Sequence, residues 1–391
     1  MRVLVLGGGK QGRAAVYDLA HAPEVQAVTC ADVDPRGLES FLATLETRKV
    51  DAVALDAADG RRLRKMLGRG FDVVIDLLPR QFVRTVGEAA IDTRTSLVNT
   101  YYDHDLRPLA QRIDKASITV LPEMGLDPGI DLVLSGEAVR KFDEVTALRC
   151  YGAGFPESSA ADNPLQYKIT WTWSGVLNSY DRPARLLRGG REVNLPASEI
   201  FAEENIHSVE VPDVGQLEAF PNGDAIRYAE KFGILSTVRD CGRYTMRWPG
   251  HAKIWDLFTK LGFLEETPVP GLPGAVTPRQ FMTCHLEPRL QYRPNERDVA
   301  VVLVVCEGLR DRRPGRLVLS LVDRRDPRTG LMAMNRTVGF AASIAGQMIV
   351  SGRIRAKGLL SPASDVPYAD FVAELAKRGM TVHESWTPLP V

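Results

Sequence analysis

The fold is decided near the N-terminus, where the chain has the sequence Val3-Leu4-Val5-Leu6-Gly7-Gly8-Gly9-Lys10-Gln11-Gly12. A short aliphatic run, typical of a strand buried on both faces, leads directly into Gly-x-Gly-x-x-Gly, and an amphipathic stretch follows. Gly7 permits the tight turn, Gly9 allows a pyrophosphate to approach the backbone, and Gly12 allows the helix to pack closely on the strand. The stretch therefore predicts a dinucleotide at this turn, with a glycine turn that binds none as the alternative.

Short aliphatic runs alternate with amphipathic stretches through the first 125 residues. The strands are expected at 3–6, 25–31, 52–55, 73–77, 96–98 and 118–121. The helices are expected at 10–20, 36–47, 60–68, 81–91 and 106–115. This alternation predicts right-handed βαβ units and an open parallel sheet. The expected fold class is α/β: a Rossmann doubly wound parallel sheet with an inserted α+β substrate-binding and dimerisation domain.

Ligands of such sheets lie at the carboxyl ends of the strands, so the residues that follow each strand are candidate cofactor contacts. Asp32 follows Gly12 by 20 residues, at a position whose carboxylate binds the adenosine ribose and repels a 2′-phosphate. This favours NAD, but Asp34 and Arg36 follow, and an arginine can hold the phosphate of NADP, so NADP stays open. The expected cofactor-binding residues are Gly7, Gly9, Lys10, Gln11, Gly12, Asp32, Asp56, Ala57, Leu77, Leu78 and Thr100.

The pattern changes after about residue 125. The elements expected there are helices at 129–141, with Pro128 in the first turn, 251–261, 337–351 and 367–378, and strands at 144–151, 299–306 and 316–322. The last two strands are expected to pair antiparallel through Gly308–Gly315. The domains expected are a dinucleotide-binding domain over 1–125, a substrate-binding and dimerisation domain over 126–336, and C-terminal helices over 337–391 that return to the first domain.

Composition excludes several classes of function. The 49 Lys+Arg and 49 Asp+Glu among 391 residues cancel, so the basic excess of a nucleic-acid binder is missing. The most apolar helical stretch, Val338–Gly352, is shorter than the roughly 20 residues that cross a bilayer, so no membrane partner is expected. Five scattered cysteines favour reduced thiols and a cytoplasmic protein. Cys284-His285 lacks ligand spacing, so no metal is expected.

Several stretches of the second half share their pattern with a known family. Leu121–Asp131 (LPEMGLDPGID) resembles the segment that leaves the last Rossmann strand in saccharopine reductases. The further blocks are 162–171, 174–177, 217–220, 243–251, 261–263 and 357–362, and several of them resemble L-lysine 6-dehydrogenases. The chain thus resembles the saccharopine dehydrogenase-like family over essentially its whole length. The resemblance implies oxidation of a C–N bond of an amino acid with NAD or NADP, and a homodimer.

Particular residues distinguish the branches of this family. Saccharopine reductases have an arginine for the glutamate arm where this chain has Gly223, and their cysteine before a Gly-Leu-Pro turn corresponds to Gly152. Pro-Gly-His251 also favours the lysine branch, whereas Asp127 matches the acid of the reductases. The resemblance implies an enzyme most like L-lysine 6-dehydrogenase. The alternatives are a glutamate-forming saccharopine dehydrogenase or imine reductase, and a non-catalytic nucleotide-sensing protein.

Oxidation of an amine to an imine requires that the nitrogen lose a proton before a hydride leaves the carbon. Asp127 is the candidate carboxylate that holds the amine and accepts this proton, and a helix-capping role before Pro128 is the alternative. Tyr101 follows the fifth strand and resembles the tyrosine of the reductases. It is expected to orient the amine or pass a proton through water, or else to pack as a buried aromatic.

Four residues of the second domain are candidates for substrate binding. Arg247 is expected to bind the α-carboxylate, because a guanidinium holds a carboxylate through two parallel hydrogen bonds, and Thr245 belongs to the same motif. Lys168 is expected to aid proton transfer or to be a surface lysine on a strand. His251 is expected to contact the N-terminus of a helix rather than act as a base.

Overall fold

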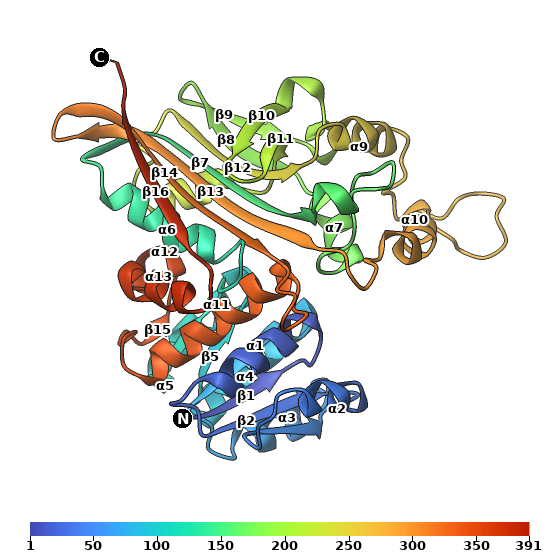
Figure 1. Cartoon of the computed structure of the whole chain (residues 1–391), viewed down its shortest axis with the longest axis vertical. Helices are drawn as coiled ribbons and strands as arrows, with labels where there is room; N and C mark the ends of the chain where they lie inside the picture. Colours follow the sequence, from blue (N-terminus) through green and yellow to red (C-terminus); the bar gives the residue numbers. More distant parts are fainter. Residues whose placement is uncertain (391) are drawn as a thin grey trace. The chain divides into compact units, whose positions relative to one another are not determined.

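The computed structural model describes residues 1–390 and divides into two compact units (Figure 1). Unit 1 comprises Met1–Glu137 and Asn335–Thr381, and unit 2 comprises Ala138–Met334 together with the residues from Val382 onward. The first boundary therefore lies twelve residues later than the expected 125/126. The last residues also depart from expectation, because they belong to unit 2.

Unit 1 is built on one sheet of seven parallel strands in the order β15-β6-β5-β4-β1-β2-β3. The strands are β1 (Arg2–Leu6), β2 (Ala27–Asp32), β3 (Val50–Ala54), β4 (Val73–Asp76), β5 (Ser96–Asn99), β6 (Thr119–Leu121) and β15 (Gly358–Leu359). The sequence analysis missed β15, because two residues are too short a run to show a strand pattern. The expected Rossmann sheet is confirmed, and its order reverses at β1.

Helices cover both faces of this sheet, which is why its strands are aliphatic. The helices of unit 1 are α1 (Lys10–His21), α2 (Arg36–Ala43), α3 (Gly60–Leu67), α4 (Val83–Thr93), α5 (Ala110–Ala116), α12 (Pro362–Asp365), α13 (Tyr368–Lys377) and most of α11 (Ala333–Val350). Leu63, Val86 and Ile113 of α3, α4 and α5 share one core cluster with Leu4 and Val74. On the other face, α11 approaches β4 closely enough that a Cβ on its Gly346 would touch Ile75.

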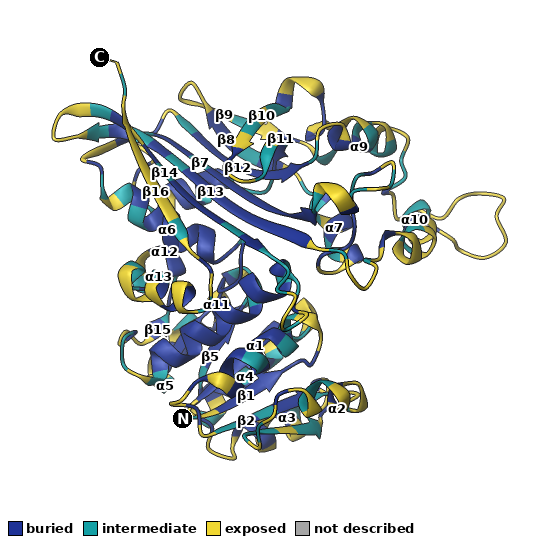
Figure 2. Cartoon of the chain, viewed as in Figure 1, coloured by how far each residue is buried: buried dark blue, intermediate teal, exposed yellow. Residues whose placement is uncertain are grey.

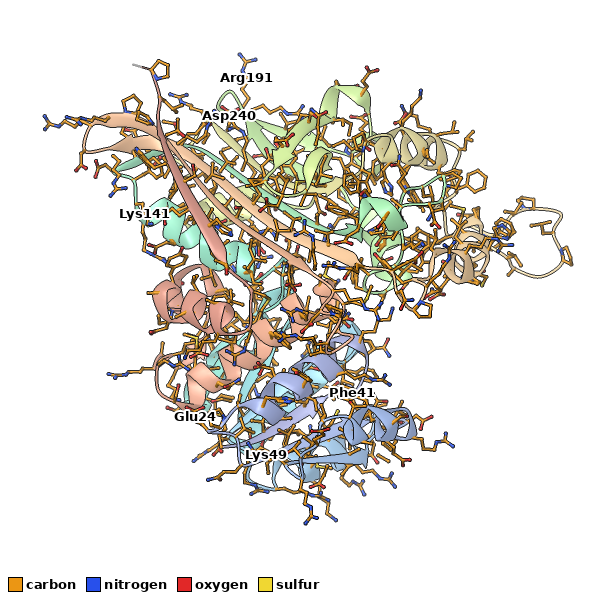
Figure 3. All side chains as sticks on the ribbon, viewed as in Figure 1. Glu24, Phe41, Lys49, Lys141, Arg191 and Asp240 are labelled. Atoms are coloured by element: carbon orange, nitrogen blue, oxygen red, sulfur yellow. The ribbon has the colours of Figure 1, made fainter. Side chains whose placement is uncertain are left out.

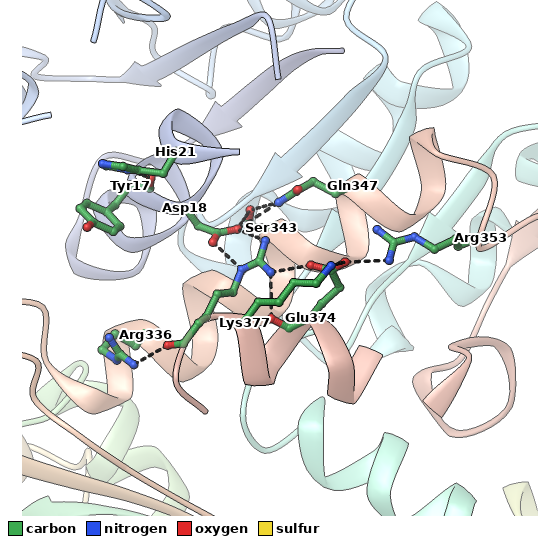
Figure 4. Close-up of polar contacts among 10 residues, drawn as sticks. Tyr17, Asp18, His21, Arg336, Ser343, Gln347, Arg353, Glu374 and Lys377 are labelled. Atoms are coloured by element: carbon green, nitrogen blue, oxygen red, sulfur yellow. Dashed lines mark hydrogen bonds and ion pairs between the residues drawn. The ribbon is translucent and has the colours of Figure 1, made fainter. Parts of the chain in front are cut away.

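A buried ion network fixes the C-terminal helices to α1 (Figure 4). Asp18 of α1 accepts hydrogen bonds from Ser343 Oγ at 2.6 Å and Gln347 Nε2 at 3.0 Å, both on α11. It also accepts from Arg378 Nη2 at 3.0 Å, and Arg378 Nη1 in turn pairs with Glu374 of α13 at 2.7 Å. The C-terminal helices thus belong to unit 1, which extends to Thr381.

Glu374 should make the protein sensitive to acid. Burial alone would raise the pKa of Glu374, but hydrogen bonds from Lys377, Arg378 and Arg353 outweigh it and lower the pKa to about 2. A depressed pKa stabilises the fold at pH values above the ordinary glutamate pKa, and this contribution is lost as the pH falls towards 2. We expect Glu374→Gln to cost about 1–2 kcal/mol at pH 7 and almost nothing near pH 2. Melting temperatures across this range measure the difference, and Glu24→Gln, at an exposed position, is the control.

Unit 2 is built on a mixed sheet of nine strands, with β10-β11-β12-β7-β13-β14-β16 in order and β8 and β9 attached at β12. The strands are β7 (Glu144–Pro156), β8 (Ala184–Arg188), β9 (Arg191–Leu195), β10 (His207–Val211), β11 (Gly215–Pro221), β12 (Asp240–Arg247), β13 (Asp298–Arg310), β14 (Arg313–Arg324) and β16 (Val382–Pro388). Its helices are α7 (Trp173–Tyr180), α8 (Ala225–Lys231), α9 (His251–Lys260) and α10 (Pro278–Leu286). The long central strands are buried over most of their length (Figure 2).

Two expectations for this sheet are wrong. Gly308 and Gly315 do not join β13 and β14 but pair with each other inside the ladder, and the turn lies at Asp311 and Arg312, which both have positive φ. The chain also does not end in helices. Residues 382–388 form β16, which pairs antiparallel with β14, and Lys141 (Figure 3) binds Glu384 of this strand at 2.6 Å.

Two general features complete the fold. Within residues 1–390, no helix combines the length and the apolar character that crossing a bilayer requires. All five cysteines carry free thiols, of which only Cys284 is exposed.

Candidate functional site

Strand register brings the predicted cofactor residues to one edge of the parallel sheet. Leu6, Ala31 and Asp76 are register partners on β1, β2 and β4, and Asp76 is in turn the partner of Asn99 on β5. The strands therefore end side by side. This carboxyl edge carries Asp32, the last residue of β2, and Gly7, Asp56, Leu77 and Thr100, which follow the other strands. Asp56 is exposed and accepts a hydrogen bond from the Ala58 N–H, while Ala57 is buried.

The glycine turn has the geometry that a phosphate cradle requires. Gly7 has φ +95°, and a Cβ on Gly12 would lie 1.9 Å from the Gly7 carbonyl oxygen, so neither position accepts a side chain without movement. Gly9 immediately precedes α1, and a Cβ there would meet nothing within 4 Å. Gly9 and Lys10 are exposed and Gln11 is half-buried. The free N–H groups of the helix N-terminus thus face open space suited to a pyrophosphate.

Asp32 has a second role besides the one expected from its position. Its Oδ2 accepts a hydrogen bond from the Gly8 N–H at 2.7 Å, so this carboxylate fixes the glycine turn. Its Oδ1 accepts from the Asp34 N–H at 3.0 Å, and Asp34 pairs with the exposed Arg36 at 2.8 Å. The groups that govern the choice between a ribose hydroxyl and a 2′-phosphate are therefore linked by hydrogen bonds.

Two polar residues at this edge escaped the sequence analysis. Asp76 and Asn99 end β4 and β5 and are both completely buried. Burial raises the pKa of Asp76 to about 7, although the Leu78 N–H, which donates to its Oδ1 at 3.1 Å, opposes the shift. The signal was present, since Asp76 and Asn99 each follow aliphatic residues at the end of a strand, but neither was predicted to contact the cofactor.

Tyr101 lies two residues after Asn99 and is half-buried. Its N–H donates to Asn99 Oδ1 at 3.1 Å, and its ring packs against the core cluster under α4. Burial, followed by the nearby charge of Asp76, raises the pKa of the phenol, so Tyr101 stays protonated at neutral pH. The structure thus places Tyr101 at the sheet edge with both a packing surface and a proton that it can donate.

Asp127 lies in a tight turn that follows β6. The turn closes through hydrogen bonds from the Gly125 N–H to the Pro128 carbonyl and from the Ile130 N–H to the Gly125 carbonyl, both at 2.9 Å. Helix α6 (Ile130–Arg140) starts after it, so Pro128 lies outside the helix and Gly129 precedes its first residue. The helix therefore begins one residue later than expected, and Gly129 rather than Asp127 directly precedes it.

In unit 2, Arg247 belongs to a directed chain of hydrogen bonds. Its Nε donates to Tyr180 Oη at 3.2 Å, and Tyr180 Oη lies 2.9 Å from His251 Nε2. His251 Nδ1 lies 2.9 Å from the Leu165 carbonyl, which can only accept, so Nδ1 carries the proton and Nε2 accepts from Tyr180. Arg247 Nη1 donates to the Met246 carbonyl at 2.8 Å, and its guanidinium lies 4.9 Å from the Tyr167 ring centre.

His251 is held neutral in this chain. It is fully buried at the start of α9, and burial, reinforced by the charge of Arg247, lowers its pKa to about 3. Both ring nitrogens are occupied, one by Tyr180 and one by Leu165. The arrangement positions Arg247 through Tyr180, which was not predicted to belong to the site.

Lys168 is neither on a strand nor on the surface, contrary to expectation. It lies in a loop before α7 with 3% of its surface exposed, and its Nζ binds Glu296 at 2.6 Å and Asp162 at 2.9 Å. Two carboxylates explain how the cation is buried, and Glu296 could not be assigned from the local pattern, since it is 128 residues away.

Thr245 and two further phenols surround Arg247. Thr245 is buried on β12 and is the register partner of Gly152 on β7. Tyr167 Oη and Tyr292 Oη are buried without a hydrogen-bond partner, and the charge of Arg247 acts on Tyr292. Unit 2 therefore contains a buried guanidinium with unsatisfied donors near it, which suits a carboxylate ligand.

Comparison with family models agrees with this division. Residues 3–121 match the model of the saccharopine dehydrogenase NADP binding domain, and residues 125–380 match that of the saccharopine dehydrogenase C-terminal domain. The predicted nicotinamide cofactor is confirmed, but the family model favours NADP, whereas the sequence favoured NAD and left NADP open.

Individual proteins give the same result. The chain is 26% identical to the L-glutamate-forming, NADP-dependent saccharopine dehydrogenase of Saccharomyces cerevisiae, over 93% of this chain and 94% of that protein. It is also 26% identical to the mitochondrial alpha-aminoadipic semialdehyde synthase of Rattus norvegicus, covering 99% of this chain but 48% of the relative. The chain thus spans about half the length of that relative and its mammalian counterparts.

Solved structures share the fold. The apo L-glutamate-forming saccharopine dehydrogenase from Saccharomyces cerevisiae matches with a TM-score of 0.85 at 24% identity, over 99% of both chains. A homospermidine synthase from Legionella pneumophila, solved with NAD, matches with a TM-score of 0.67 at 11% identity, over 99% of this chain and 91% of the other.

Proposed function

Because the chain belongs to the saccharopine dehydrogenase family, we propose that it is an NAD(P)-dependent oxidoreductase acting on a carbon–nitrogen bond of an amino acid. The observation that carries this proposal is the turn Gly7–Gly12, which leaves open the space that a pyrophosphate needs and precedes a helix with free N–H groups. When bound, the nicotinamide ring accepts or gives the hydride.

The residues of unit 1 then handle the nitrogen. We propose that Asp127 stabilises the substrate ammonium and takes its proton, because an amine must be uncharged before a hydride can leave the adjoining carbon. Tyr101, protonated at neutral pH, orients the nitrogen or returns a proton to it in the reverse direction. Both residues follow strands of the same parallel sheet, β6 and β5.

Arg247 binds a carboxylate of the substrate in this proposal. The guanidinium is buried, and Tyr180, the Met246 carbonyl and the Tyr167 ring fix its orientation. Such a pre-oriented guanidinium binds a carboxylate without first losing side-chain freedom. Neutral His251 supports it indirectly, since a second positive charge there would repel Arg247.

Two substrates compete within this class. Gly223 and Gly152 favoured lysine in the sequence analysis, but the relatives are named L-glutamate-forming saccharopine dehydrogenases. The structure weakens the argument from Gly223, because the Arg182 guanidinium lies next to it: a Cβ on Gly223 would be 3.6 Å from Arg182 Nη2. A guanidinium from another segment therefore lies beside residue 223. We propose saccharopine as the substrate, with lysine as the second candidate.

One assay separates the candidates. The protein is incubated with NADP or NAD and either saccharopine or L-lysine, and the absorbance of the reduced nicotinamide is followed. We expect reduction with saccharopine and release of free glutamate. Reduction with lysine alone would establish the second candidate. Tight cofactor binding without turnover on either substrate would refute the enzymatic proposal and favour the nucleotide-sensing alternative.

Substitution of Arg247 should weaken substrate binding specifically. Arg247→Leu removes a charge-assisted pair of hydrogen bonds worth about 1.5–3 kcal/mol, so we expect KM to rise about 10- to 100-fold with cofactor affinity unchanged. Initial rates over a range of substrate concentrations measure this. Arg243→Leu is the control, because Arg243 lies on the same strand with its guanidinium 4.4 Å from the Tyr228 ring centre. A normal KM in Arg247→Leu would refute the carboxylate role.

A further inference from the structure

Asp76 and Asn99 form a matched pair at the carboxyl edge of the sheet. They end neighbouring parallel strands in register. Each side chain is fixed by a hydrogen bond from the backbone N–H of the residue two positions later in the chain. The Leu78 N–H donates to Asp76 Oδ1 at 3.1 Å, and the Tyr101 N–H donates to Asn99 Oδ1 at 3.1 Å. The two side chains therefore have the same local geometry on adjacent strands.

The remaining atom of each side chain has no partner. Asp76 Oδ2 and Asn99 Nδ2 are both buried and make no hydrogen bond. Leaving a buried polar group unsatisfied costs about 1–3 kcal/mol, and two of them side by side indicate a missing ligand. In the ionised carboxylate Asp76 Oδ2 is an acceptor, and Asn99 Nδ2 is a two-proton donor, so together they complement a group that offers an N–H and a carbonyl oxygen side by side.

The place of the pair identifies that group. The sheet order reverses at β1, and Asp32 at the end of β2 marks the adenosine half of the dinucleotide site. Asp76 and Asn99 end β4 and β5, on the opposite side of the glycine turn, where the nicotinamide half must lie. The nicotinamide carries a primary carboxamide, whose NH₂ and C=O match the acceptor and the donor.

We propose that Asp76 Oδ2 and Asn99 Nδ2 bind the nicotinamide carboxamide, with Asp76 accepting from its NH₂ and Asn99 donating to its carbonyl. This assignment rests on the proposed function only in requiring a nicotinamide cofactor. Both atoms are closed to solvent, so this proposal requires that the residues covering them move when the cofactor binds. A donor at Oδ2 also stabilises the ionised carboxylate, which burial otherwise disfavours.

The test compares the cofactor with its nicotinic acid analogue, in which a carboxylate replaces the carboxamide. Dissociation constants are measured by titration calorimetry for NADP, nicotinic acid adenine dinucleotide phosphate and 2′-phospho-ADP-ribose. If NAD binds more tightly than NADP, the same three compounds without the 2′-phosphate are used. We expect the wild type to bind the carboxamide form at least about 30-fold more tightly than the acid form, because Asp76 repels a second carboxylate. Asp76→Asn, whose NH₂ can donate to the acid form, should reduce this ratio to about 3 or less.

Two controls separate the possible failures. Asp72→Asn, at the exposed amino end of the same strand, should leave the ratio unchanged, and every folded variant should bind 2′-phospho-ADP-ribose equally well. A wild type that does not discriminate, or an Asp76→Asn variant that keeps the full ratio, would overturn the carboxamide assignment and indicate a buried water at the pair. A wild type that binds none of the three nucleotides would instead refute the proposed function. If Asp76→Asn does not fold, the wild-type ratio alone decides.

Discussion

Gly12→Ala is expected to abolish measurable dinucleotide binding. The new Cβ would lie 1.9 Å from the carbonyl oxygen of Gly7, a backbone atom that no rotamer change can move away. Either α1 or the glycine turn must shift, and a shift of the turn withdraws the N–H groups that bind phosphate. We expect affinity to fall more than about 100-fold and the free energy of unfolding to fall by about 1–3 kcal/mol.

Gly9→Ala is the matched variant for this experiment. Its Cβ would meet nothing within 4 Å, and the residue already has extended backbone angles, so the unliganded fold should keep its melting temperature. Cofactor affinity should nevertheless fall, because the methyl group occupies space that the pyrophosphate needs. Nucleotide titration and thermal melting of both variants give the answer. Unchanged affinity in both variants would refute a dinucleotide site at this turn.

Asp127→Asn is expected to lower kcat by about 10²- to 10⁴-fold, the usual contribution of a general base. Asparagine keeps the size of the side chain but cannot accept the proton of the substrate ammonium, so cofactor binding should stay as in the wild type. Steady-state kinetics with saturating cofactor and a separate cofactor titration measure the two effects.

The neighbouring Asp131 provides the control. It lies four residues further along and is completely buried, and its Oδ1 accepts a hydrogen bond from the Gly129 N–H at 2.6 Å. We expect Asp131→Asn to lower the melting temperature with little change in kcat per folded molecule. Loss of kcat in Asp131→Asn without loss in Asp127→Asn would show that the turn, and not the carboxylate of residue 127, matters for the reaction.

The sequence predicted unit 1 well because its signals are local. Buried parallel strands are aliphatic over consecutive residues, and the Gly7–Gly12 motif requires glycine for reasons of backbone geometry alone. Every strand that was predicted in this sheet exists, with ends displaced by a few residues. The last strand of unit 2 escaped because β16 is mostly polar and exposed, and its pairing with β14 leaves no mark in its own composition.

The environments of the site residues in unit 2 could not be predicted, because they depend on distant partners. His251 is neutral because it is buried beside Arg247, and its ring nitrogens contact Tyr180 and Leu165, which are 71 and 86 residues away in the sequence. Lys168 is buried through Glu296, which lies on a segment with no recognisable pattern. The sequence around a lysine or histidine does not show which charged group it will contact in the fold. Residue type therefore identified candidate residues but not their protonation states.

The order in which the chain builds the two units has a genetic consequence. The polypeptide changes units at 137/138, at 334/335 and again at 381/382, so no single cut in the gene separates them. A fragment that ends at residue 137 would lack α11 and α13 and leave Asp18 without Arg378. A fragment that ends at residue 381 would lose β16 and expose the edge of β14 to other chains. Both units therefore need the whole chain, because each is built from separate segments of the sequence.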